Sequence, residues 1–317
     1  MSKPRSAIAA YAVYLVVRVM VCFVQALPFA AAQSFAAGLA WLAYRVDRRH
    51  REVAVDNLRH AFPGRWNDRE LDEQVRQVYE HFCRLLVEIV NLPRRMHVRN
   101  WQKYLELGDE AITVAAQISG RPLLIVTGHL GNWEMAGYAI GLLGFHSYAI
   151  ARPLDNPYLD DYLRRFREST GQRVLAKHGD FDQMQSLLER GGTLATLGDQ
   201  DAGQRGLFVD FFGRPASTHK AIALLALEHR VPLLVLAALK VGEPMRYRVQ
   251  VADFILPEEY DGQRDAVKAI TQRFTLALER LVRTAPSQYF WLHRRWKHQP
   301  AQPKRKPASA GAAERAA

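Results

Sequence analysis

Cysteine is scarce in this 317-residue chain, which contains only Cys22 and Cys83. Their spacing fits neither a zinc site nor a redox pair, so we expect a reducing compartment and thiols that fill the core. The chain also lacks a His-Glu-x-x-His zinc motif, a Gly-x-Ser-x-Gly nucleophile elbow and any internal repeat. These absences argue against a zinc protease, a serine hydrolase of the elbow type and a repeat protein.

Acidic residues are fewer than basic ones: 32 Asp and Glu stand against 43 Lys and Arg, for a formal net charge of +11. A chain of this charge favours anionic partners, which are a nucleic acid, an anionic membrane surface or an acidic substrate. The content of 49% hydrophobic and 24% charged residues is typical of a globular protein. At this length one large domain with appendages is expected.

One long apolar run stands near the N-terminus, "AIAAYAVYLVVRVMVCFVQALPF", from Ala7 to Phe29. About 20 apolar residues suffice to cross a bilayer, although Arg18 and Pro28 interrupt this run. A signal peptide is the alternative, because basic residues precede the run. The apolar chain that continues to Tyr44 and the basic cluster behind it favour an uncleaved membrane anchor over residues 1–46. No recognised nucleic-acid module accompanies the anchor, so we expect no nucleic-acid partner.

Beyond the anchor, the patterns predict a helical lead-in over 47–120, an α/β domain through 299 and a disordered basic tail over 300–317. Short β-branched runs alternate with amphipathic stretches, which predicts a central, mostly parallel and partly mixed sheet flanked by helices. The expected strands are 123–127, 147–151, 173–175, 193–197, 207–211, 232–239 and 247–251. The expected helices are 48–61, 68–90, 132–143, 156–169, 181–189, 218–229 and 263–283.

The stretch "TGHLGNWEMAG" begins at Thr127, directly behind a predicted buried strand. Five residues of a continuous helix turn about 500°, so His129 and Glu134 would lie on different faces. We therefore expect the strand to end near Thr127, His129 to lie in a turn, and a helix to begin near Asn132, a candidate N-cap. Glu134 in the first helical turn can then fold back toward the imidazole.

A histidine supported by a carboxylate can act as a general base. No serine or cysteine lies beside the pair in sequence, so the base would activate a substrate hydroxyl or water directly. Direct acyl transfer from a thioester to an alcohol fits this chemistry. The alternatives are hydrolysis by the same pair, and a non-catalytic membrane-tethered protein in which the histidine only fills a turn. The spacing is not that of metal ligands, so we expect no metal.

Five further segments accompany this motif: "NLRHAFP", "ARPLDNPYLD", "LGDQDAGQRGLFVDFFGRPAST", "VPLLVL" and "SQYFWLHRRWKHQP". In order and spacing the six segments resemble the late acyltransferases of lipid A biosynthesis, of the lauroyl and myristoyl type. That family lies within the lysophospholipid acyltransferase superfamily, and the likeness extends to about residue 300. It implies a fold like that of glycerol-3-phosphate acyltransferases.

The resemblance implies O-acylation of a lipid A precursor at the cytoplasmic side of the inner membrane, without a cofactor. Acyl carrier protein, which is acidic and suits the net charge, would supply the acyl group, and coenzyme A is the alternative donor. An acyltransferase acting on a glycosylated phospholipid or aminolipid is the alternative function. We expect a monomer with an apolar groove that leads to His129.

The resemblance also implies site residues, with His129 as the base and Glu134 as its partner. Arg152 follows a predicted strand and can bind a phosphate, although a surface arginine in a turn would look the same. Phe211 and Phe212 form an apolar strip suited to an acyl chain, or an ordinary strand and turn. The remaining residues expected to bind substrate are Asn132, Asp199 and Gln200.

Overall fold

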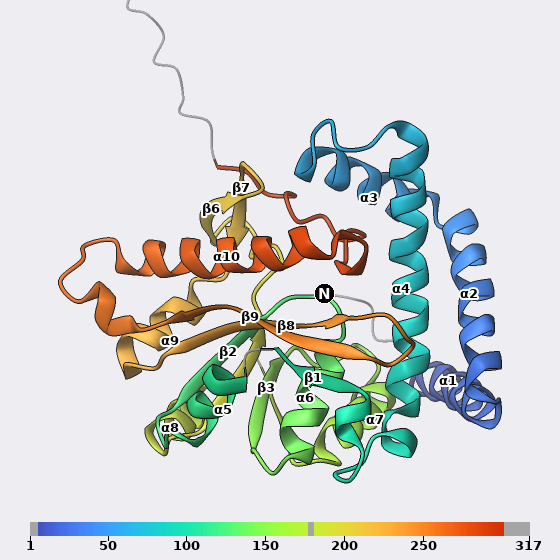
Figure 1. The fold of residues 1–317 in the computed structure, drawn as a ribbon, viewed down its shortest axis with the longest axis horizontal. Helices are drawn as coiled ribbons and strands as arrows, with labels where there is room; N and C mark the ends of the chain where they lie inside the picture. The colour runs from blue at the N-terminus through green and yellow to red at the C-terminus, as the bar shows by residue number, and fades with distance from the viewer. Residues whose placement is uncertain (1–5, 109, 177–180, 301–317) are drawn as a thin grey trace, which may run out of the picture.

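The computed structural model describes residues 6–108, 110–176 and 181–300 (Figure 1). The predicted tail therefore lies, apart from Pro300, outside the described residues. A seven-stranded sheet in the order β1-β9-β8-β2-β5-β3-β4 forms the centre. Its neighbouring strands are parallel except for the antiparallel pair β8 and β9. This arrangement confirms the predicted α/β fold with a mostly parallel, partly mixed sheet.

The strands of the sheet are β1 (Leu105–Leu107), β2 (Leu123–Thr127), β3 (Ser147–Ala151), β4 (Arg173–Ala176), β5 (Thr193–Leu197), β8 (Leu233–Lys240) and β9 (Tyr247–Ile255). A separate antiparallel hairpin consists of β6 (Leu207–Phe211) and β7 (Arg214–Thr218). The helices are α1 (Ala7–Ala26), α2 (Phe29–Val46), α3 (Arg48–Ala61), α4 (Asp68–Arg95), α5 (Glu110–Ile118), α6 (Trp133–Leu142), α7 (Pro157–Glu168), α8 (Phe181–Glu189), α9 (Ala221–His229) and α10 (Ala266–Thr284).

Helices cover both faces of the sheet, and the side chains of β2 show why the strand is apolar throughout. Leu124 and Val126 pack in a core with α8, α9 and α10, whereas Leu123 and Ile125 pack in a second core with α6. Successive side chains of a strand point to opposite faces, so a strand covered on both sides needs an unbroken apolar run. The run "LLIV" that ends before the candidate site is therefore the centre of the domain.

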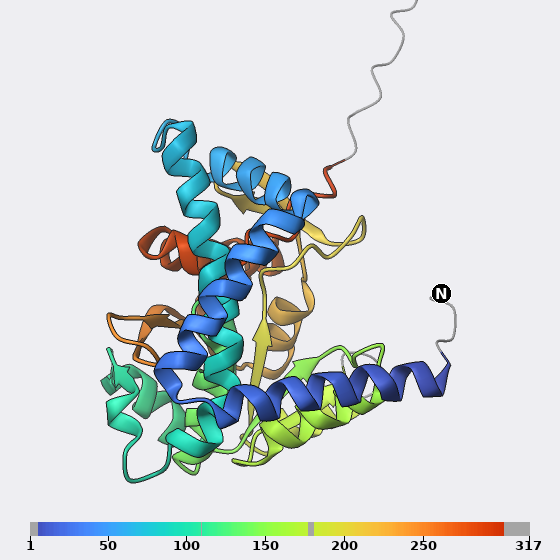
Figure 2. The same ribbon diagram turned by 90° about the vertical axis from the view of Figure 1, so that its right-hand side faces the viewer.

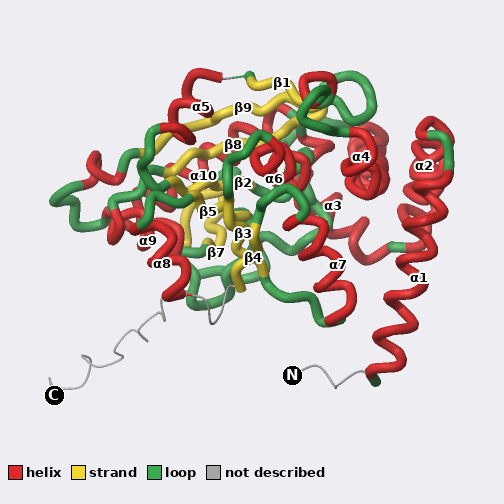
Figure 3. Tube along the Cα trace, turned by 90° about the horizontal axis from the view of Figure 1, so that it is seen from below, coloured by secondary structure: helices red, strands yellow, loops and turns green. Residues whose placement is uncertain are grey.

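The first two helices lie outside the sheet and its covering helices. Among the described helices, α1 is long and apolar enough to cross a membrane. It is therefore a candidate membrane anchor, as the sequence predicted. α2 packs against the long helix α4, and α1 runs lengthwise beside α7 (Figures 2 and 3).

The hairpin β6–β7 explains why one predicted helix begins later than expected. The expected helix over 218–229 begins only at Ala221, because residues 214–218 pair with β6. Phe212 and Gly213 connect the two strands with φ angles of +56° and +73°, as a type I′ turn requires. A phenylalanine is uncommon with a positive φ, but Glu279 accepts the backbone N–H of Phe212 at 2.6 Å and holds the turn in place.

A buried carboxylate joins α4 to the sheet. Glu88 is fully buried and accepts hydrogen bonds from Lys240 Nζ at 2.7 Å, from the backbone N–H of Met245 at 3.2 Å and from the Tyr247 hydroxyl. A carboxylate without water is stable only when its oxygens are paired in this way. This network fixes the position of α4 relative to β8 and β9.

We predict that Glu88→Ala destabilises the protein by about 3–5 kcal/mol, because it leaves the Lys240 ammonium without its partner in a largely buried position. Denaturant unfolding monitored by circular dichroism measures this change. The matched control is Glu52→Ala, which removes the exposed pair with Arg48 and should cost less than about 1 kcal/mol. Equal losses in the two variants would contradict the prediction.

Candidate functional site

Strand register brings His129 and Asp199 together. β2 and β5 are parallel neighbours, and Thr127 is opposite Leu197 in their register. Each functional residue follows its strand end by two positions, so both emerge at the carboxyl edge of the sheet, where open α/β sheets form their sites. Asp199 Oδ1 lies 2.9 Å from His129 Nδ1, and Asp199 Oδ2 accepts the backbone N–H of His129 at 2.8 Å.

The surroundings of this pair favour an ionised carboxylate next to a basic imidazole. Asp199 is 2% exposed, and burial alone would raise its pKa, but the charge and hydrogen bonds of His129 hold that pKa well below its usual range. Burial also acts to lower the pKa of His129, yet the neighbouring Asp199 outweighs this effect and raises it. Nδ1 donates to the carboxylate, which leaves Nε2 as the basic atom. Gln200 Nε2 lies 3.4 Å from that atom.

The loop that carries His129 is held by a segment near the C-terminus. The backbone N–H of Phe290 donates to the His129 carbonyl at 2.9 Å, and Leu130 forms a β-bridge with Tyr289. Gly131 has a φ of +61°, and a Cβ atom there would lie 1.9 Å from the Ala238 carbonyl oxygen. Only glycine fits this close approach. The loop therefore has one conformation, fixed from two sides.

Glu134 was expected to fold back toward the imidazole, but its hydrogen bonds go to other residues. The carboxylate, 8% exposed, accepts two hydrogen bonds from Arg167 of α7 and one from the Trp133 indole N–H, at 3.1 Å. As the second residue of α6, Glu134 faces α7, and Asp199 takes the position at Nδ1. Glu134 acts on His129 through its charge, which contributes to the raised pKa, and through Trp133, whose ring centre lies 5.1 Å from the imidazole centre.

Two other candidate residues serve different purposes from those expected. Asn132 is the N-cap of α6, as predicted, and its side chain accepts the backbone N–H of Met135 at 2.8 Å. It is fully buried, so it is not placed to contact a substrate. Arg152 follows β3 at the same edge of the sheet, but its side chain is 79% exposed and pairs with Asp155 at 3.3 Å. The structure therefore brings Gln200, but neither Asn132 nor Arg152, into contact with the His129–Asp199 pair.

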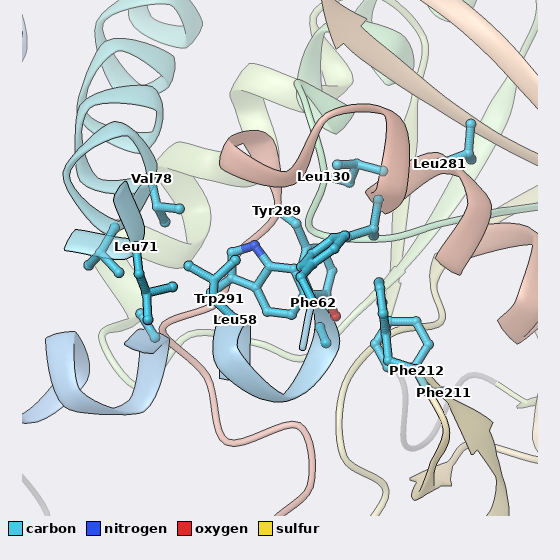
Figure 4. Close-up of a cluster of buried hydrophobic side chains, with 14 of the residues drawn as sticks. Leu58, Phe62, Leu71, Val78, Leu130, Phe211, Phe212, Leu281, Tyr289 and Trp291 are labelled. Atoms are coloured by element: carbon cyan, nitrogen blue, oxygen red, sulfur yellow. The ribbon is translucent and has the colours of Figure 1, made fainter. Parts of the chain in front are cut away.

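Phe211 and Phe212, the strip expected to suit an acyl chain, are 1% and 5% exposed and line neither of the two apolar spaces described below. Both are buried in a core that also contains Phe62, Trp291 and Tyr289 (Figure 4). The rings of Phe62, Phe212 and Trp291 all contact one another: the Phe62 centre lies 5.3 Å from that of Phe212 and 6.0 Å from that of Trp291, and the latter two are 5.8 Å apart. Because Leu130 belongs to the same core, these aromatic residues support the site loop from behind.

The segments "NLRHAFP" and "SQYFWLHRRWKHQP" meet in the fold. Asn57 donates through its amide to the carbonyls of Trp291 and His293, at 2.8 and 2.9 Å. Arg295 is buried and donates to the Ser217 carbonyl at 2.6 Å and to Thr218 Oγ1 at 2.7 Å. These contacts make the basic C-terminal segment part of the folded core, except for its exposed side chains such as Lys297.

Two apolar spaces share Trp133 and Glu134 as lining residues, and the Trp133 ring contacts the imidazole of His129. The inner cavity, of about 80 Å³, lies between α6 and strands β2, β3 and β5. The outer groove, of about 520 Å³, lies among α1, α2, α4 and α7. Trp133 and Glu134 line both, and Arg167 lines the inner cavity. A long apolar chain in either space would therefore lie against Trp133, the residue that contacts the His129 ring.

Sequence reasoning missed two members of this site, Arg167 and Trp133. Arg167 shows no sequence signal, because it is one of several charged residues on an amphipathic helix. The pairing of Asp199 with His129 had a partial signal, since both follow apolar strands at the same offset. This shared offset predicts a contact between the two residues only when β2 and β5 are known to be neighbours in the sheet.

A histidine–carboxylate pair at the carboxyl edge of an α/β sheet, in contact with a tryptophan that lines two apolar spaces, defines a candidate enzyme that acts on long apolar chains. Comparison with known proteins defines its class. The family model of the bacterial lipid A biosynthesis acyltransferases matches residues 1–298. The chain belongs to this family and is an acyltransferase of lipid A or related lipids, which confirms the resemblance seen in the sequence.

Curated relatives of this chain are acyltransferases of two lipid classes. It is 25% identical to the lipid A biosynthesis lauroyltransferase of Escherichia coli K12, over 86% of this chain and 88% of the relative. It is 24% identical to the lipid A biosynthesis palmitoleoyltransferase of the same organism, over 80% of each. It is also 26% identical to the phosphatidylinositol mannoside acyltransferase of Mycolicibacterium smegmatis, over 71% of this chain and 73% of that protein.

We predict that Asp199→Asn lowers the pKa of His129, because a neutral amide stabilises the imidazolium less than a carboxylate does. NMR titration of the imidazole resonances measures this pKa. His81, whose pKa burial lowers to about 4, should not change and serves as the internal control. Glu134→Gln should lower the His129 pKa less, since Glu134 makes no hydrogen bond to that ring. An unchanged His129 pKa in Asp199→Asn would contradict this account.

Proposed function

We propose that this protein transfers a fatty acyl chain from an acyl thioester to a hydroxyl of a lipid A precursor, with His129 as the general base. The observation that carries the proposal is the His129–Asp199 pair, whose imidazole contacts Trp133, a residue that lines both apolar spaces. Among the described residues, no serine or cysteine forms a hydrogen bond with His129, which favours direct attack by the acceptor.

In the proposed mechanism, His129 Nε2 takes the proton of the acceptor hydroxyl as its oxygen attacks the thioester carbonyl. Asp199 keeps Nδ1 protonated and stabilises the imidazolium that forms. The tetrahedral intermediate then collapses, the carbon–sulfur bond breaks, and the imidazolium returns its proton to the leaving thiolate. The Gln200 amide, close to Nε2, is placed to donate a hydrogen bond to an oxygen of the substrates. Glu134 supports the base indirectly, by holding Trp133 against the ring.

The donor chain is assigned to the inner cavity. Its walls include small side chains on neighbouring strands, among them Ala149, Ala151 and Ala195, which leave room between α6 and the sheet. The cavity is small as it stands, so a chain would have to displace the side chains around it. Acyl carrier protein is the proposed donor, because an acidic carrier complements a net charge of +11. Neither a metal nor a cofactor enters this mechanism.

We place the enzyme on the cytoplasmic side of the inner membrane, where an acyl carrier protein can reach it. The apolar helix α1 and the basic residues after α2 support attachment to an anionic membrane surface. A second candidate acceptor is a glycosylated phospholipid, which the similarity to a phosphatidylinositol mannoside acyltransferase favours. Incubation with each radiolabelled lipid and with carrier proteins of different chain lengths, followed by mass spectrometry of the product, distinguishes the two.

We predict that His129→Ala lowers the transfer rate by at least about 10²–10⁴-fold, the usual contribution of a general base. The assay is transfer of a labelled acyl chain from carrier protein to the lipid A precursor. Flotation with vesicles provides the control, since membrane association should be unchanged. Near-normal turnover by this variant would rule out the mechanism.

We also predict that kcat/KM rises with pH, because the base must be neutral and is protonated below its pKa. Asp199 raises the pKa of His129 above its ordinary value of 6.5, so the midpoint of the rise should lie above that value. In Asp199→Asn the midpoint should move to lower pH. A profile that is flat through the neutral range would contradict a titrating histidine base.

A further inference from the structure

The anchor helix α1 forms a wall of the outer groove. Val17, Met20, Val21 and Val24 line the groove from α1, at the spacing of one helical face. The opposite walls come from α4, with Cys83 and other apolar side chains, and from α7. A helix that served only as a tether would not need a stripe of apolar side chains turned toward the enzyme.

Contacts along its length show that α1 is docked on the domain. The Asn156 amide donates to the Ala10 carbonyl at 2.8 Å, and the ring of Tyr11 meets that of Tyr158 at 5.1 Å. Midway along the helix, the Arg18 guanidinium lies 4.6 Å from the ring centre of Tyr162. A spanning helix would place this arginine in hydrocarbon at high cost. Beside α7, which is rich in charged residues, α1 instead lies along the surface of the enzyme.

The outward face of α1 is apolar and open, with Val19 67% exposed. Arginines stand near the same groove: Arg18 on α1, and Arg94 and Arg95 at the end of α4. Among the described residues, none of the three has a carboxylate within salt-bridge distance, and Arg94 donates to the carbonyl of Gln25, a groove residue, at 2.7 Å. An apolar face with unneutralised guanidinium groups beside it complements a lipid with acyl chains and an anionic headgroup.

Trp133 and Glu134 line the groove next to the site, and the Trp133 ring contacts the His129 ring. We propose that the outer groove binds an acyl chain of the acceptor, an anionic bilayer lipid, and that α1 is the wall facing the membrane. This inference rests on the proposed function. The acceptor is assigned here, rather than the donor, because the groove adjoins the exposed apolar face of α1, whereas a carrier-bound thioester arrives from water.

The test uses vesicles containing phosphatidylglycerol with a diazirine at the end of one acyl chain. After photolysis, mass spectrometry locates the labelled residues of the full-length protein. We expect adducts on Cys83 and Val87 in the groove in addition to adducts on the outward face of α1. Val17→Trp with Val21→Trp should fill the groove and remove the adducts on Cys83 and Val87. The matched control, Leu276→Trp, adds the same bulk to an exposed apolar position of α10 outside the groove and should retain them.

The same variants are compared by transfer to the lipid acceptor and by vesicle flotation. The groove variant should float normally and lose about tenfold or more in kcat/KM, whereas Leu276→Trp should stay within about twofold of wild type. Wild-type adducts confined to the outward face would overturn the inference, as would full transfer by the groove variant. Groove adducts that an acylated carrier protein, but not unlabelled phosphatidylglycerol, displaces would assign the groove to the donor and overturn it too.

Photolabelling does not depend on catalysis, so it separates this inference from the proposed function. His129→Ala should show the wild-type adducts on Cys83 and Val87. If those adducts form and no lipid is acylated by the wild-type enzyme, the proposed function fails and the lipid groove stands. If transfer is normal and the groove is never labelled, the proposed function stands and the groove assignment fails.

Discussion

The parallel register of β2 with β5 is the constraint on which the site depends. It sets His129 opposite Asp199, and the two residues need each other for different reasons. An unpaired carboxylate at the burial of Asp199 would be strongly destabilising, and an imidazole without that carboxylate would lose the proton on Nδ1 that directs Nε2 outward. Gly128 permits the contact, since a Cβ atom there would lie 3.2 Å from the carboxyl carbon of Asp199. The hydrogen bond between His129 and Asp199 therefore both stabilises the fold and sets the protonation of the imidazole.

The segments that carry the family resemblance divide between chemistry and support. "TGHLGNWEMAG" and the first residues of "LGDQDAG" supply the His129–Asp199 pair, and Phe290 of the C-terminal segment packs near the imidazole. "NLRHAFP" and the rest of the C-terminal segment help to build the aromatic core behind the loop, in which Asn57 connects α3 to the C-terminal segment and Phe62 contacts Phe212. This division explains why a short local motif is weak evidence for a family when it occurs alone, and strong evidence when the supporting segments accompany it. The precision of a small site requires a large amount of packing from distant parts of the chain.

The strength of local signals explains which predictions held. The strand at 123–127 was predicted with its observed bounds, because a buried strand between polar turns has a distinctive composition. β1 has only three residues, and β7 contains Pro215, which argues against a strand away from an edge, so both were missed. Asn132 was correctly predicted as a cap from neighbouring residues alone. The partner of Glu134 lies 33 positions away on another helix, and no local rule selects Arg167 from the charged residues around it.

The clamp on the His129 loop has a consequence for the order of biosynthesis. The residues that hold the loop, Gln288 to Phe290, emerge from the ribosome long after α1 and α2. The apolar N-terminal helices therefore emerge while the His129 loop still lacks the contacts that hold it. A nascent chain that ended before Gln288 would carry α1 and α2 with the His129 loop unsupported on that side.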